Sequence, residues 1–180
     1  MALTDQRGIR VRNSVLWSLA AVACSLSASV DLTACGDKYL RLANRLGPAY
    51  TAERQATVLL YTPSDSAAHA GARRLGLKGT LERAGHRVYA VEADADLEVT
   101  LQTRVYDVII ADTASAGVIG EKLARAAGKP TLLPILHNAP KREVEMARKQ
   151  QGCLISSRET AVYAAAEVDH VMELRKTAQP

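Results

Sequence analysis

From Ala56 onward the sequence repeats one pattern, a short apolar run followed by a longer amphipathic stretch. The apolar runs have the length of buried strands and occupy residues 57–62, 87–91, 108–111, 131–136 and 153–156. The stretches between and after them have the length and polarity of helices and occupy 66–84, 95–104, 116–127, 141–150 and 159–176. Strands that are apolar on both faces and alternate with helices indicate a parallel sheet covered on each side. The sequence therefore predicts an α/β fold, a five-stranded parallel doubly wound three-layer sandwich.

Chain-breaking residues support these boundaries. Gly85, Pro130 and Gly152 come directly before or close to the second, fourth and fifth strands, where a helix has to end. Gly71, Gly76 and Gly79 weaken the first helical stretch and predict a break within 75–79. Because aromatic residues make up only 4% of the chain and phenylalanine is absent, the core has to be built from Ala, Val, Leu and Ile.

The N-terminal residues 1–34 have the features of an export signal. Arg7, Arg10 and Arg12 precede an apolar run at 15–30, which is a basic region followed by a hydrophobic region. The run is shorter than the roughly 20 apolar residues that a membrane-spanning helix needs. We therefore expect a signal peptide at 1–34, a polar basic extension at 35–55 and the α/β domain at 56–180. The expected location is the periplasm or a membrane face.

Two modifications of Cys35 compete. Leu32-Thr33-Ala34-Cys35 resembles the lipobox of bacterial lipoproteins, in which the cysteine is lipidated, although Asp31 is an unusual residue at that place. Contact with a membrane is expected only in that case. An ordinary signal peptide would instead leave Cys35 and Cys153 as the two cysteines of the exported chain, and a pair in an oxidising compartment predicts a disulfide. The intact mass of the exported protein distinguishes the two alternatives.

Residues 84–116 (AGHRVYAVEADADLEVTLQTRVYDVIIADTASA) resemble the middle of a bacterial response-regulator receiver domain. The resemblance extends over about 56–176 and implies the flavodoxin-like version of the doubly wound fold. It also implies that Asp112, which ends the third strand, stands at the position of the family's phosphoacceptor. A receiver holds Mg²⁺ with that residue and an acidic pair that ends the first strand, because the phosphoryl donor's charge has to be neutralised.

Only Asp112 matches the family's site. Tyr61, Thr62 and Pro63 stand in place of the acidic pair. His137 or Asn138 stands in place of the family's Ser or Thr after the fourth strand, and Ser156 or Ser157 in place of its Lys after the fifth. The resemblance thus predicts a degenerate receiver that is not an enzyme, with no catalytic residues and no cofactor.

The carboxyl ends of parallel strands meet at one edge of a doubly wound sheet, where ligands usually bind. Polar residues that follow the strands should gather there and form a cleft of Thr62, Asp112, Thr113, His137, Asn138, Ser156, Ser157 and Arg158. Short polar residues at these places also serve as helix caps, and Ser64 and Asp65 are expected to cap the first helix.

Three functions follow. The first is a protein-interaction module in the cell envelope, which contacts an unidentified envelope protein through 141–151 and 159–175, the partner face of receivers. The second is a small-ligand protein that binds an anion or metabolite at the cleft, through helix N-termini and Arg158. The third is a phosphoacceptor receiver at Asp112.

Metal and nucleic acid are not expected. His69, His86, His137 and His170 are widely spaced, and Glu167 and Glu173, one turn from His170, are interpreted as part of a solvated helix face. The net charge of +4 is small and its Lys and Arg residues are dispersed, which argues against a nucleic-acid surface.

Overall fold

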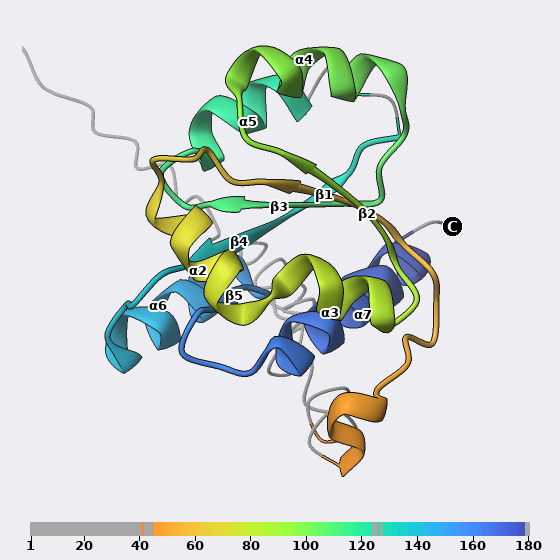
Figure 1. Ribbon diagram of the computed structural model, residues 1–180, viewed down its shortest axis with the longest axis vertical. Helices are drawn as coiled ribbons and strands as arrows, with labels where there is room; N and C mark the ends of the chain where they lie inside the picture. The colour runs from red at the N-terminus through yellow and green to blue at the C-terminus, as the bar shows by residue number, and fades with distance from the viewer. Residues whose placement is uncertain (1–40, 42–44, 124–125, 127, 179–180) are drawn as a thin grey trace, which may run out of the picture. The chain divides into compact units, whose positions relative to one another are not determined.

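The computed structural model describes residues 41, 45–123, 126 and 128–178. The predicted signal peptide and Cys35 lie outside these residues. Five strands form one sheet in the order β2-β1-β3-β4-β5, and all four neighbouring pairs are parallel (Figure 1). They are β1 (Thr57–Tyr61), β2 (Arg87–Val91), β3 (Val108–Asp112), β4 (Thr131–Leu136) and β5 (Ile155–Ser156). This arrangement confirms the predicted fold class, including its flavodoxin-like strand order.

Helices cover both faces of the sheet (Figure 1). They are α2 (Ala67–Leu75), α3 (Leu77–Arg83), α4 (Asp94–Thr103), α5 (Ala116–Leu123), α6 (Lys141–Gln151) and α7 (Ala161–Thr177). The elements α2, α3 and α7 lie on one side, and α4 and α5 lie on the other. The predicted break in the first helical stretch is confirmed, because Gly76 separates α2 from α3 in a left-handed conformation with φ of 55°.

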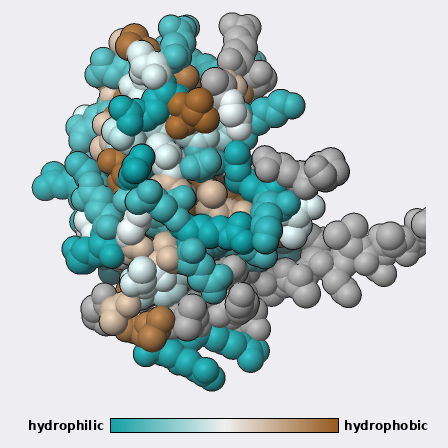
Figure 2. Space-filling model, turned by 90° about the vertical axis from the view of Figure 1, so that its right-hand side faces the viewer, coloured by the Kyte–Doolittle hydropathy of each residue, from teal (hydrophilic) through white to brown (hydrophobic). Residues whose placement is uncertain are grey.

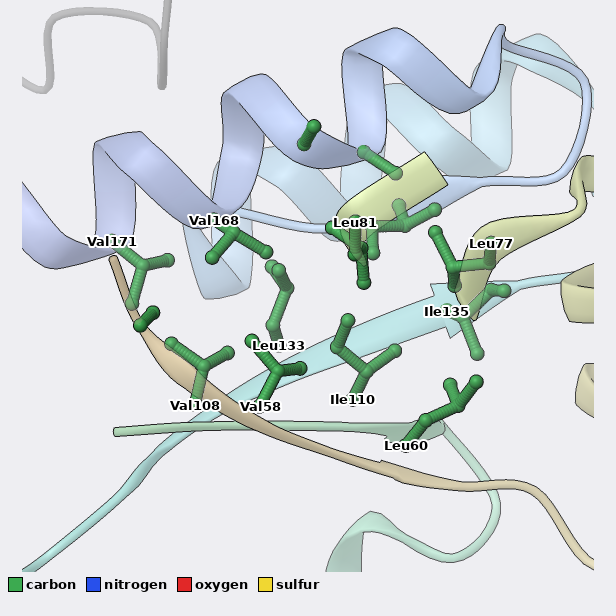
Figure 3. Close-up of a cluster of buried hydrophobic side chains, with 14 of the residues drawn as sticks. Val58, Leu60, Leu77, Leu81, Val108, Ile110, Leu133, Ile135, Val168 and Val171 are labelled. Atoms are coloured by element: carbon green, nitrogen blue, oxygen red, sulfur yellow. The ribbon is translucent and has the colours of Figure 1, made fainter. Parts of the chain in front are cut away.

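Strand residues divide between the two faces by simple alternation. Leu60, Ile110 and Ile135 face α2, α3 and α7, where Leu77 and Val168 pack against them in the aliphatic cluster of Figure 3. The neighbouring strand residues face α4 and α5 in a second cluster, which contains Leu59, Tyr61, Ile109, Ala111, Leu97, Leu101, Tyr106 and Ile119. A third, smaller cluster joins α6 to the ends of β4 and β5 and contains Leu136, Ala139, Val144 and Leu154. The core is aliphatic, as the composition requires.

From Tyr50 to Ala56 the chain before β1 packs against the domain, although residues 35–55 were expected only as a polar extension. A short 3-10 helix, η1 (Gly47–Ala49), leads to Tyr50, which is 4% exposed and belongs to the main core cluster. The Tyr50 hydroxyl donates a hydrogen bond to Asp169 of α7, and the Glu53 amide donates a second one at 3.2 Å. Ala52 is joined to Ala84 by a backbone hydrogen bond of 2.7 Å. The segment from Gly47 therefore stabilises the α3–α7 side of the domain.

Among the described residues, no helix combines enough length with enough apolar character to cross a bilayer.

Candidate functional site

The predicted cleft residues all lie at the carboxyl ends of the strands, but they form two groups. Thr62, Asp112 and Thr113 follow the central strands β1 and β3. The remaining five follow β4 and β5 at the border of the sheet: His137, Asn138, Ser156, Ser157 and Arg158. Within the part of the chain that the structure describes, no hydrogen bond or ion pair joins one group to the other. The two groups thus keep separate sets of polar contacts.

In the central group, Asp112 stabilises a turn. Its Oδ1 atom accepts a hydrogen bond of 2.5 Å from the backbone N–H of Ser115, at the entry to α5. Thr62 is buried, and its amide donates a hydrogen bond of 3.1 Å to the carbonyl of Val91. Ser66, rather than the expected Ser64 or Asp65, caps α2 by accepting the His69 amide at 3.1 Å. These polar groups are thus engaged in turns and caps.

Tyr61, which the sequence analysis considered only as a residue in place of the acidic pair, lies next to this central group and near three carboxylates. The Tyr61 hydroxyl donates a hydrogen bond to Asp94 at the start of α4. Burial, that hydrogen bond and the charges of Asp94, Asp112 and Asp65 together raise the pKa of Tyr61 to about 12. No set of three or more His, Cys, Asp or Glu side chains in the described ranges could hold a metal ion.

In the border group, two arginines converge on one residue. Arg74 of α2 donates from Nη1 to the side-chain oxygen of Asn138 at 3.5 Å, at the long end of hydrogen bonding. Arg158 donates from Nη2 to the backbone carbonyl of Asn138 at 3.2 Å. Asn138 itself adopts a positive φ of 52°, and its backbone N–H donates a hydrogen bond of 3.0 Å to the Ser157 hydroxyl. We call Arg74, His137, Asn138, Ser157 and Arg158 the arginine edge.

Within the arginine edge, His137 packs close to Gly71 of α2. Its Nε2 atom lies 2.9 Å from the side-chain nitrogen of Asn138. A Cβ atom at Gly71 would lie 3.0 Å from Nδ1 of His137 and 3.3 Å from Cβ of Ser157. Any larger residue would therefore have to displace the imidazole or the serine, so the glycine at position 71 permits this close approach.

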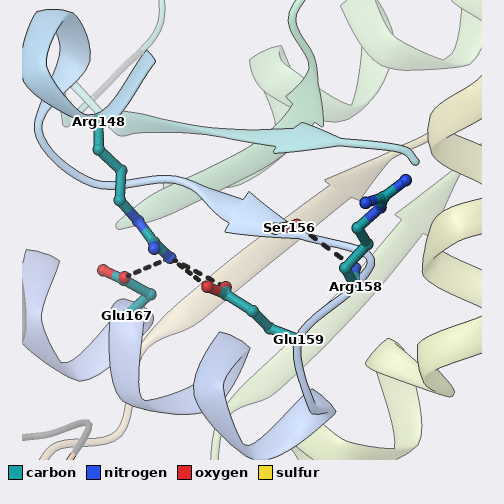
Figure 4. A network of polar contacts seen from close by, with 5 residues as sticks. All are labelled: Arg148, Ser156, Arg158, Glu159 and Glu167. Atoms are coloured by element: carbon teal, nitrogen blue, oxygen red, sulfur yellow. Dashed lines mark hydrogen bonds and ion pairs between the residues drawn. The ribbon is translucent and has the colours of Figure 1, made fainter. Parts of the chain in front are cut away.

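Ser156, the last residue of β5, and Ser157, which follows it, both accept backbone N–H groups through their hydroxyl oxygens. Ser156 accepts the backbone N–H of Arg158 at 3.3 Å (Figure 4). Ser157 accepts the amide of Asn138, and its own amide donates to the Leu136 carbonyl at 2.9 Å. Together these bonds tie the loop after β5 to the loop after β4.

The arginine edge carries positive charge that the described residues do not neutralise. Arg74, Asn138 and Arg158 are exposed, and neither arginine takes part in any ion pair among the described residues. Arg74 lies 64 residues before Asn138 in the chain, and for that reason the sequence analysis could not assign it to this site.

An ion network of two half-buried side chains and one buried side chain lies next to the loop that carries Arg158 (Figure 4). Arg148 of α6 donates from Nη2 to both carboxylate oxygens of Glu159, at 2.7 and 2.9 Å. The same nitrogen lies 3.7 Å from Oε1 of Glu167 in α7. The interpretation of Glu167 as part of a solvated helix face is wrong, because this residue is 0% exposed and Ala164–Asp169 are all buried. The sequence spacing of Glu167 and Glu173 from His170 does not reveal which residues pack around α7.

Because most of α7 is buried or half-buried, less of the predicted partner face at 141–151 and 159–175 is exposed than expected. Ala166, Val168 and Val171 are in the core, whereas Leu174 is 49% exposed. Most of the exposed surface within 141–151 and 159–175 therefore belongs to α6.

The predicted disulfide and lipid site cannot be followed to Cys35, which lies outside the described residues. Cys153 is 8% exposed and packs in the main core cluster just before β5. Its pairing with Cys35 stays a prediction.

The chain was compared with protein-family models, curated proteins and solved structures, and no match was found in any of the three comparisons.

Proposed function

We propose that this protein binds a small anionic ligand at the arginine edge and does not transfer phosphoryl groups. The observation that carries the proposal is the convergence of Arg74 and Arg158 on Asn138. The ligand class is a compact oxyanion, such as a phosphate or sulfate group or a carboxylate. For the exported protein that we expect, this ligand would be met outside the cytoplasm.

Electrostatics favours an anion at this place. Two guanidinium groups that approach the same residue repel each other, and an anion between or beside them removes that repulsion. Each guanidinium has five N–H donors, and only one donor interaction to the protein is found for each of these two side chains within the described ranges. The remaining donors suit the oxygens of a phosphate or carboxylate, to which arginine binds in a forked geometry.

The neighbouring groups support binding rather than catalysis. The Asp112 carboxylate is engaged by the Ser115 amide, and the Ser156 and Ser157 hydroxyls both accept backbone N–H groups. These contacts give each side chain a structural role that does not require chemistry. A shift of residues around Asp112 on addition of beryllofluoride and Mg²⁺ would instead support the phosphoacceptor alternative.

The interaction module stays a second candidate, favoured by one observation on α6. Met146 is 48% exposed on this helix, between charged residues such as Lys149 and the ion pair of Lys141 with Glu145. On the face shown in Figure 2, however, hydrophobic residues form separate small patches within a hydrophilic surface. Isolated apolar residues are ordinary on monomeric proteins and do not by themselves indicate a partner. Crosslinking in the cell envelope through position 146 would test this candidate.

A titration with sulfate and inorganic phosphate tests the proposed site. We expect both anions to raise the melting temperature of the protein and to shift the NMR signals of Asn138 and Arg158. Replacing Arg158 or Arg74 with Gln should weaken binding about tenfold, since each loses a charge-assisted hydrogen bond.

Arg73→Gln is the matched control, because Arg73 is also an exposed arginine of α2 but has no hydrogen bond to Asn138 in the described structure. Equal losses in the Arg73, Arg74 and Arg158 variants would mean that general positive charge attracts the anion. That result, or no response of the native protein to either anion, would contradict the proposal.

A further inference from the structure

Arg148 of α6 lies beside two carboxyl groups, Glu159 in the loop before α7 and Glu167 in α7 itself. The side chain of Arg148 is 30% exposed, that of Glu159 is 25% exposed and that of Glu167 is 1% exposed. Glu159 receives two hydrogen bonds from Arg148, whereas neither oxygen of Glu167 has a hydrogen-bond partner. The Nε atom of Arg148 is also buried without a hydrogen-bond partner. Arg148 thus has a buried donor without a hydrogen-bond partner, and Glu167 has two buried acceptors without one.

The ionisation of Glu167 decides how Arg148 is shared. Burial raises the pKa of Glu167 to about 8, against the opposing effect of the Arg148 charge and with a further increase from Glu159. A raised pKa favours the protonated form of Glu167 at neutral pH, and in that form Glu167 leaves Arg148 to Glu159. When Glu167 ionises, the buried carboxylate needs the cation more than Glu159 does, because Glu159 can be solvated by water.

Glu159 is adjacent to Arg158, so the network acts on the arginine edge through a very short segment. The Glu159 amide donates to the Ser156 carbonyl at 3.0 Å, and the Arg158 amide donates to the Ser156 hydroxyl at 3.3 Å. Figure 4 shows Arg158 and Glu159 side by side in this loop, with the Glu159 side chain directed to Arg148. Fixing Glu159 on α6 therefore fixes the backbone from which Arg158 reaches Asn138.

We propose that Arg148 is a positioning residue for the arginine edge, which it acts on through Glu159, and that ionisation of Glu167 withdraws Arg148 from Glu159 and weakens anion binding. This inference rests on the proposed function and adds a regulation to it. Arg148 does not touch the anion. Its effect is to hold the loop of Arg158 in the geometry that binds it.

Few other charged groups act on this network. Arg148 of α6 faces Glu167. Glu159, in the loop before α7, also acts on Glu167 through its charge. On α7 itself, Tyr163 and His170 lie about one turn away from Glu167. The α2, α3 and sheet residues packed against this part of α7 are mainly aliphatic. All variants of the test keep His137, the histidine of the arginine edge.

The test measures sulfate affinity at about pH 7 and about pH 9.5, on either side of the Glu167 pKa of about 8. Sulfate is the probe because its charge is constant over this range. In the native protein we expect the Kd to rise about fivefold at the higher pH, a modest coupling between sites, with the amide signals of Arg158 and Glu159 moving through an inflection near that pKa. Glu167→Gln should remove both effects, because glutamine imitates the protonated acid.

A second pair of variants separates positioning from charge. Arg148→Lys keeps the charge but loses the planar group that holds Glu159, so it should weaken sulfate binding about fivefold at pH 7. Arg142→Lys, at an exposed position of the same helix, should leave the affinity unchanged. An affinity that falls with pH while the Arg158 and Glu159 signals stay still would show an effect of charge alone and overturn the inference.

The outcomes also separate this inference from the proposed function. Sulfate binding with the same pH dependence in the native protein and in Glu167→Gln overturns the inference and leaves the proposed function intact. No sulfate binding at either pH overturns both.

Discussion

At the scale of single residues, burial controls the ionisation of His86. Only 4% of this residue is exposed, its Nδ1 accepts the Ala56 amide at 3.3 Å, and its Nε2 is buried without a hydrogen-bond partner. Desolvation by burial lowers the pKa of His86 from 6.5 to about 4. The neutral imidazole is thus part of the folded structure at the junction of the segment before β1 with β2.

This pKa predicts a loss of stability in mild acid. Because the folded pKa is lower than the unfolded one, the contribution of His86 is fully present above about pH 6.5 and is lost as the pH falls to about 4. Over that range the free energy of unfolding should fall by about 2 to 3 kcal/mol on account of this residue alone. Urea denaturation at a series of pH values measures it.

His86→Asn provides the comparison, since its side-chain oxygen can accept the Ala56 amide but does not titrate. This variant should lose most of the acid sensitivity, even if it is less stable at neutral pH because asparagine is smaller. His69→Asn, at a half-buried histidine, should keep the acid sensitivity. Identical pH profiles for the native protein and His86→Asn would rule out this explanation.

At the scale of elements, glycines decide how α2 and α3 follow one another across the sheet. Gly76 has φ of 55°, and a Cβ atom added there would meet nothing within 4 Å. Position 76 therefore needs glycine for its backbone conformation and not for space. The left-handed backbone ends α2 and starts α3 in a new direction. At Gly71 the requirement is space, since His137 and Ser157 lie against it.

Alanine at position 76 should destabilise the protein by about 1 kcal/mol, the strain of a left-handed residue with a Cβ atom. Gly120→Ala, at an exposed helical position in α5 with open space around it, should instead stabilise by about 0.5 to 1 kcal/mol. Thermal unfolding of the two variants measures the difference. If both substitutions stabilised the protein, the break at Gly76 would not depend on its left-handed backbone.

At the scale of the whole molecule, the segment from Gly47 to Gln55 joins the domain through buried and half-buried contacts. The Tyr50 hydroxyl and the Glu53 amide both donate to Asp169, and Arg54 forms an ion pair of 3.4 Å with Glu173 of α7. Burial raises the pKa of Asp169, and the hydrogen bonds from Tyr50 and Glu53 oppose that rise. The segment thus supplies donors to a carboxyl group that the domain itself buries.

Tyr50→Phe should therefore lower the free energy of unfolding by about 1.5 to 3 kcal/mol, the usual value of a hydrogen bond to a charged group. Tyr89→Phe is the control, because the Tyr89 hydroxyl accepts a hydrogen bond only from exposed Arg104 among the described residues. Chemical denaturation near neutral pH compares the two variants. Equal losses would show that the contact between Tyr50 and Asp169 adds no particular stability.

Much of the fold could be predicted because its signals are local. The strands at 87–91 and 131–136 agree with the structure at both ends, and the break predicted within 75–79 lies at Gly76. Each of these depends on a few consecutive residues, on their hydropathy or on a glycine's freedom. The cap of α2 was misplaced by one or two residues, because Ser64, Asp65 and Ser66 are all good capping residues and only the backbone path selects Ser66.

The sequence by itself determined the class and order of the elements, the aliphatic core, and the edge of the sheet at which polar residues gather. These follow from periodicity and from the geometry of parallel strands, which require no knowledge of distant contacts. Only the tertiary structure decided which polar residues meet: Arg74 and Arg158 at Asn138, Arg148 between Glu159 and Glu167, and Tyr50 at Asp169. The physical reason is that such pairs are formed by packing between elements far apart in the chain, and no local pattern records which side chain will face which.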